Sequence, residues 1–120
     1  MSEHEDGDSS DPVVCNPAFY RTVFENSRVR VLEYRDSPGD RARPHRHPDS
    51  VMVTLGPFRR LISNESNSVE VELDGGEVRW LDAQEHWGEN IGSTETHTIF
   101  VELKEPGSDE RSSRLGPASS

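Results

Sequence analysis

The apolar positions of this chain fall in short runs rather than at the three-to-four-residue spacing of a helix. Runs at 19–24, 28–35 and 51–55 are rich in Val, Tyr, Phe and Thr, and Gly, Pro, Asn or Asp interrupts them. Further runs cover 58–62, 69–73, 77–81 and 96–103. Such β-rich runs between turn residues predict strands. We therefore expect about seven or eight strands, essentially no helix, and an all-β sandwich or barrel.

The turn residues predict how neighbouring strands connect. Asp74-Gly75-Gly76 favours a hairpin that joins 69–73 to 77–81, because Asp and Gly adopt the backbone conformations that short hairpin turns require. Trp80 lies in the second of these strands, and we expect it to pack in the core.

The charge of the chain is unevenly distributed. The formal net charge is −10, and residues 1–11 contain acidic side chains but no Lys or Arg. Residues 105–120 are rich in Ser, Gly and Pro. We therefore expect a disordered acidic tail over 1–12, one β domain over 13–104 and a second disordered tail over 105–120. Because an acidic surface repels phosphate backbones, we expect no nucleic-acid partner.

Membrane and secretion signals do not stand out in the sequence. No run approaches the ~18 apolar residues of a membrane helix, and the start lacks the basic and apolar segments of a signal peptide. Cys15 is the only cysteine, which excludes an internal disulfide and a cysteine zinc cluster. We expect a cytoplasmic protein with no membrane partner.

Three histidines are the strongest candidates for chemistry. His45 and His47 are separated by one residue, so in extended backbone their rings point the same way, roughly 6.6 Å apart along the strand. The pair alone has two interpretations, two metal ligands or two surface histidines in a polar loop. His86 lies ahead of Trp87-Gly88, where it can lie opposite the pair across a barrel mouth and complete a metal site.

Two spaced motifs resemble those of a known family. The matching positions are Gly39, His45 and His47 in the first motif and Gly75, His86 and Asn90 in the second. On these residues the chain resembles a small single-domain cupin over about residues 13–104. It is similar to bacterial one-domain cupins, some of them associated with β-alanine catabolism. The resemblance implies a cupin-type double-stranded β-helix, also called a jelly-roll barrel.

The sequence departs from the cupin pattern at a metal ligand. The family glutamate would fall at position 51 or 52, where Val51 and Met52 stand. The expected carboxylate ligand is therefore missing. Asp49, Ser50 and Asn90 are candidates for an additional ligand or for a residue that supports the ligands.

The resemblance also implies the remaining site. One divalent transition metal ion is expected, with Fe, Zn, Ni, Cu and Mn not distinguished by the ligand types. The implied metal ligands are His45, His47 and His86, and the expected pocket wall comprises Trp87, Met52 and His97. No catalytic residue is assigned.

Two functions stay open. The first is a mononuclear metal site that binds or transforms a small anionic metabolite, with oxygenase, isomerase and hydrolase chemistry unresolved. The second is a non-catalytic small-molecule-binding cupin that has lost the metal site, a reading that the missing glutamate favours. Fold resemblance does not separate these functions. We also expect a homodimer, because the short strand at 19–24 can add to the sheet of a second copy.

Overall fold

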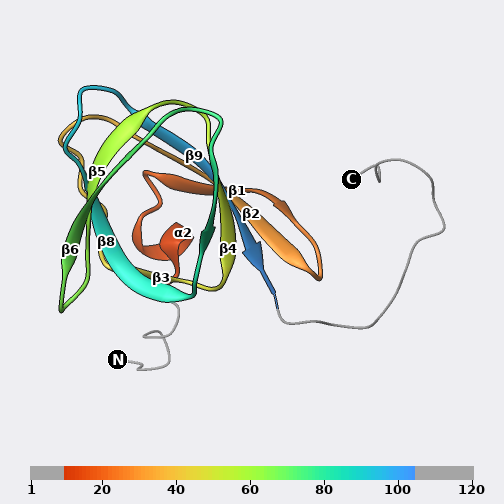
Figure 1. The fold of residues 1–120 in the computed structure, drawn as a ribbon. Helices are drawn as coiled ribbons and strands as arrows, with labels where there is room; N and C mark the ends of the chain where they lie inside the picture. The colour runs from red at the N-terminus through yellow and green to blue at the C-terminus, as the bar shows by residue number, and fades with distance from the viewer. Residues whose placement is uncertain (1–9, 105–120) are drawn as a thin grey trace.

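A computed structural model describes residues 10–104, so most of the two predicted tails lies outside the described residues. Two antiparallel sheets, with strand orders β1-β2-β9-β4-β7 and β3-β8-β5-β6, curve into a barrel (Figure 1). The elements are α2 (Pro12–Cys15), β1 (Tyr20–Glu25), β2 (Val29–Asp36), β3 (His45–His47), β4 (Ser50–Thr54), β5 (Phe58–Ser63), β6 (Ser68–Leu73), β7 (Val78–Leu81), β8 (Gln84–Asn90) and β9 (Thr96–Leu103). The predicted all-β jelly-roll barrel is confirmed. No helix in the described part of the chain is long and apolar enough to cross a membrane.

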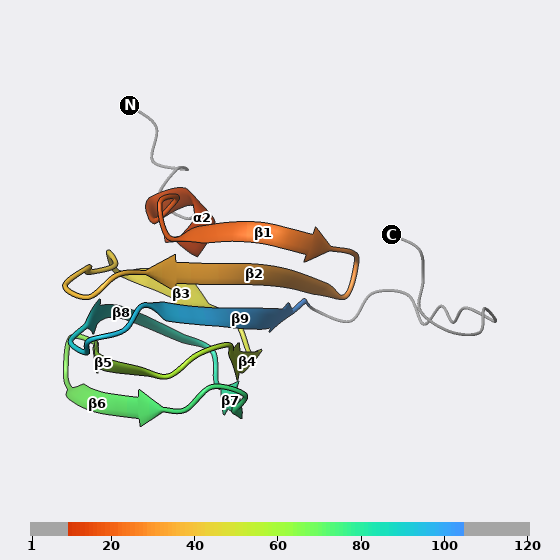
Figure 2. The ribbon, with the colours of Figure 1, turned by 90° about the horizontal axis from the view of Figure 1, so that it is seen from above.

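The β1–β2 hairpin extends the first sheet beyond the barrel, and β9 lies against β2 along its length (Figure 2). Side chains alternate along β2. Leu32 and Tyr34, on the opposite face from Val29 and Val31, are buried. Together with Tyr20 and Phe100 they form a small apolar cluster. Most of the other buried residues among those described are polar or charged, which is unusual for a domain interior and indicates a functional site.

The Asp74–Gly76 turn does not form the predicted hairpin. β6 pairs with β5 and β7 pairs with β4, so the turn is a corner between the two sheets. Thr54 holds this corner. Its Oγ1 donates to the Asp74 carbonyl at 2.6 Å and accepts from the Glu77 N–H at 2.8 Å. Gly76 has a φ of 82°, a left-handed conformation that favours glycine.

Three elements, α2, β3 and β8, were not among the predicted runs. Asp11 accepts a hydrogen bond from the Val13 N–H and caps the helical turn α2, so residues 10–12 belong to the folded domain rather than to the predicted tail. β8 contains His86 but few strand-favouring residues. It forms because β3 and β5 pair with it on its two sides, which is tertiary context that overrides local propensity. Trp80 is 53 % exposed rather than packed in the core.

The two hydrogen bonds of the Thr54 hydroxyl predict that its removal lowers the stability of the fold. Thr54→Val keeps the side-chain shape but removes the hydroxyl from two backbone groups at this part-buried corner. We expect the free energy of unfolding to fall by about 1–3 kcal/mol, because buried polar groups without partners are costly. Urea denaturation followed by circular dichroism checks this. An unchanged urea midpoint of unfolding contradicts a stabilising role for the Thr54 hydroxyl.

Candidate metal centre

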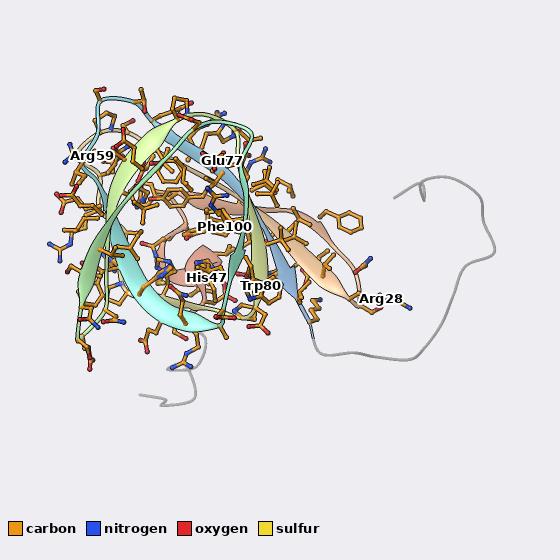
Figure 3. All side chains as sticks on the ribbon, in the orientation of Figure 1. Arg28, His47, Arg59, Glu77, Trp80 and Phe100 are labelled. Atoms are coloured by element: carbon orange, nitrogen blue, oxygen red, sulfur yellow. The ribbon has the colours of Figure 1, made fainter. Side chains whose placement is uncertain are left out.

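The three predicted histidines converge inside the barrel. His45 and His47 occupy alternate positions of β3, and His86 of β8 is the cross-strand partner of His45. One ring nitrogen of each lies within 4.8 Å of the others. The rings therefore meet on neighbouring paired strands, rather than across a barrel mouth as the sequence suggested. Figure 3 shows His47 pointing into the interior, on the same side as Phe100.

Hydrogen bonds fix the orientation and tautomer of each imidazole. The Nδ1 of His45 lies 2.6 Å from the Arg43 carbonyl oxygen, that of His47 lies 2.9 Å from Glu102 Oε2, and that of His86 lies 2.7 Å from Gln84 Oε1. Because these three oxygens accept, each Nδ1 carries a proton. Each Nε2 is then left with a lone pair, which is the form of histidine that binds a metal ion.

Burial keeps two of these rings uncharged. Desolvation lowers the pKa of His45 to about 4 and the pKa of His86 to about 3. The neighbouring imidazoles and Arg60 act in the same direction. Since a protonated imidazole has no lone pair to donate, both rings are available as ligands at neutral pH.

Tyr20 supplies a fourth polar group that sequence reasoning missed. Its hydroxyl lies 3.2 Å from Nε2 of His45 and 3.2 Å from Nε2 of His47. Burial raises the pKa of Tyr20 well above its usual value, so the group is a neutral phenol in this environment. The hydroxyl can donate its proton to one of the two nitrogens. The only signal in the sequence was the position of Tyr20 near the start of the predicted strand at 19–24.

Glu102 is the second missed residue. It accepts from His47 and also forms an ion pair with Arg30, whose guanidinium contacts Asp11 as well. Residues 96–103 alternate, with Thr96, Thr98, Phe100 and Glu102 buried. Because the aliphatic residues of this strand occupy the other alternating positions, the local pattern did not indicate that Glu102 is buried.

His45 and His86 line a cavity of about 320 Å³. Met52, which stands where the family glutamate can fall, lines it, and so does Trp80. The structure differs from the expected pocket wall at Trp87 and His97, which are absent from the lining. Each lies between two residues that line the cavity, His86 and Gly88 for Trp87 and Thr96 and Thr98 for His97, so both side chains point away from the cavity. His97 Nε2 instead lies 2.6 Å from Glu33 Oε2.

The candidates for an additional ligand lie elsewhere among the described residues. Asp49 accepts from the Ala83 N–H, and the Ser50 hydroxyl donates to the Pro48 carbonyl. Asn90 Nδ2 donates to Asp36 Oδ1 at 3.1 Å, so it organises a buried carboxylate rather than the histidine cluster.

The donor set fits a transition metal ion. One ring nitrogen from each of the three imidazoles lies within 4.8 Å of the others, and the Nδ1–H of each ring is held by an oxygen acceptor, which leaves Nε2 free to bind a metal ion. Imidazole ligands suit Fe, Zn, Cu and Ni. Where the Nδ1 proton is fixed by a carboxylate or carbonyl, such outer contacts also strengthen metal binding.

Comparisons with solved structures agree with this architecture. A cupin domain from Bordetella pertussis is 30% identical, with a TM-score of 0.66 over 71% of this chain and 91% of that chain. A double-stranded β-helix protein from Klebsiella pneumoniae is 17% identical, with a TM-score of 0.57 over 70% and 74%. An RmlC-like cupin from Methanocaldococcus jannaschii is 10% identical, with a TM-score of 0.58 over 70% and 77%. No family model matches this chain, and no curated protein sequence matches it.

The Glu102 contact predicts a loss of metal affinity. Glu102→Gln weakens the acceptor for the His47 Nδ1–H, and we expect affinity for Zn²⁺ to fall roughly 10–100-fold, as for other residues that orient metal-binding histidines. Competition titration against a chromogenic chelator measures the change. Glu33→Gln is the matched control, because it alters an equivalent carboxylate–histidine pair at His97, outside the cluster. Equal losses in both variants contradict a specific role for Glu102.

Proposed function

The chain belongs to the cupin superfamily, and from this membership we propose that it is a mononuclear metal protein that binds or transforms a small anionic metabolite. The observation that carries the proposal is that one ring nitrogen each of His45, His47 and His86 lies within 4.8 Å of the others, beside a cavity that His45 and His86 line. Their Nδ1 hydrogen bonds support the same assignment.

The charge of the ligand set favours an anionic ligand. Three neutral imidazoles leave the full positive charge of a divalent ion at the centre, unlike a set that includes a carboxylate. Such an ion supplies Lewis-acid chemistry and open coordination positions when bound. The protein's own part is to hold the three rings, to place the Tyr20 hydroxyl beside them and to limit water through the surrounding apolar wall.

A second candidate is a binding module without catalysis. Two observations favour it. Met52 lines the cavity at a position where the family has a carboxylate, and none of the described residues in the lining is Asp or Glu. A general base of the usual carboxylate kind is therefore not provided by the cavity wall.

Metal analysis tests the proposed centre. We expect protein purified without a histidine tag, and then loaded with Zn²⁺, to hold close to one equivalent by elemental analysis. The double variant His45→Ala/His47→Ala should hold essentially none, because it removes two of three ligands. His97→Ala is the matched control and should keep the metal, since His97 lies outside the cluster. Wild-type protein that stays metal-free after loading with Zn, Fe(II), Ni, Cu and Mn rules out the metal centre.

We further propose that the protein forms a homodimer through β1. Among the described strands, β1 pairs with β2 alone, and Val23 and Phe24 on it are 42% and 43% exposed. We expect dimers at tens of micromolar, about tenfold or more above a ~1 μM dissociation constant, and monomers for Phe24→Glu. Sedimentation velocity distinguishes these states, and a monomeric wild type at that concentration contradicts the proposal.

A further inference from the structure

We propose that the cavity contains a second recognition site, formed by Arg60 and Thr98, that binds the carboxylate of a small organic acid while the histidine centre holds another part of the same molecule. This deepens the proposed function, because the metal centre is one of its two anchors. Both residues line the cavity.

Arg60 presents unused hydrogen-bond donors to the cavity. It is 7% exposed, and its Nη1 donates to Asp36 Oδ2 at 2.7 Å and to Thr96 Oγ1 at 3.0 Å, while Nη2 donates to Tyr34 Oη at 3.2 Å. A guanidinium has five N–H donors. The Nε–H and one N–H of Nη2 have no partner among the described residues. Adjacent Nε–H and Nη2–H groups match the two oxygens of a carboxylate.

Gly88 makes room for this guanidinium. A Cβ at position 88 would lie 2.7 Å from Arg60 Nη2 and 3.2 Å from Arg60 Nε. Any larger residue would therefore displace the guanidinium from the wall. Gly88 follows His86 by two residues on β8, so the two positions share one face roughly 7 Å apart. That spacing lets one small molecule reach both the histidine centre and Arg60.

Thr98 supplies the independent second observation. It is 1% exposed, and its Oγ1 is the only buried side-chain polar atom in the described part of the chain without a hydrogen-bond partner. Its cross-strand partner on β2 is Tyr34, which bonds to Arg60, and Thr96 on the same face of β9 also bonds to Arg60. An orphaned hydroxyl beside these groups is explained if a ligand oxygen completes it.

The charges around Arg60 favour a carboxylate of modest affinity. Asp36 pairs with Arg60 and also accepts from Tyr34 and Asn90, so the protein's own charge is balanced there. The ligand is then held by directed hydrogen bonds and by the positive centre at the histidines. The wall beside Arg60 is apolar. Its residues from β5 and β6 are Phe58, Ile62, Val69, Val71 and Leu73. A short hydrocarbon body between the two anchors fits this wall and the volume of about 320 Å³.

The test uses straight-chain acids from acetate to hexanoate, each with its matching primary amide, and the full chain with and without bound Zn²⁺. Isothermal titration calorimetry at pH 7 gives the dissociation constants. We expect at least one acid to bind about tenfold or more tightly than its amide, which is the scale of hydrogen bonds to a charged group. Equal binding of every acid and its amide overturns the proposal.

Thr98→Val is the decisive variant, because it removes only an unpartnered hydroxyl. We expect carboxylate binding to weaken about tenfold, the melting temperature to stay level or rise, and Thr98→Ser to restore binding. Arg60→Lys keeps a charge beside Asp36 but loses the planar pair of donors, and it should also weaken binding. Thr54→Val is the matched control: it should lose stability without losing the preference for acid over amide, since its hydroxyl bonds only to backbone.

The outcomes separate this site from the metal centre. If Zn²⁺ binds at one equivalent but Thr98→Val binds every acid as the wild type does, the Arg60–Thr98 site is wrong and the metal centre stands. If Zn²⁺ does not bind, but metal-free protein still prefers an acid in a Thr98-dependent way, the carboxylate site is supported and the metal centre fails.

Discussion

The register between β3 and β8 is the constraint on which the site depends. His45 faces His86 as a direct cross-strand partner, and His47 follows on the same side of β3. A slip of one residue would turn either strand's inward set outward, because side chains alternate along a strand. β3 has only three residues, so it contributes little pairing of its own. β5, on the other side of β8, holds β8 in place, and with it the histidine cluster.

The interior tolerates its polar groups because they are arranged in compensated pairs. Asp36 is paired with Arg60, and Glu102 is paired with Arg30. Each carboxylate also serves a second group, Tyr34 for the first and His47 for the second. Removing one member of such a pair leaves a buried charge, which costs more than the pair contributes. The two pairs therefore orient the side chains of the cavity more than they stabilise the fold.

Sequence reasoning succeeded where local pattern and long-range structure agree. The β-rich runs predicted seven of the strands, and motif spacing selected three histidines that meet in space. It failed where partners distant in sequence decide the outcome. β8 has weak intrinsic strand preference and forms between two neighbours, and the Asp74–Gly76 turn is a corner because Thr54 bonds to its backbone. Tyr20 reaches the histidines from β1, a distance of 25 residues or more in sequence, and no local pattern predicts that contact.

Tyr20 also explains how the cluster can exist without the family carboxylate. Met52 faces the cavity from β4, so the position that commonly carries the acid contributes an apolar wall. The polar group that lies beside His45 and His47 is instead the neutral phenol of Tyr20, from β1. A neutral group leaves the charge of a bound cation undiminished, whereas a carboxylate would cancel part of it. The absence of a carboxylate beside the histidines therefore makes the centre more attractive to an anion. The orientation of that anion is left to groups farther along the cavity, where Arg60 and Thr98 lie.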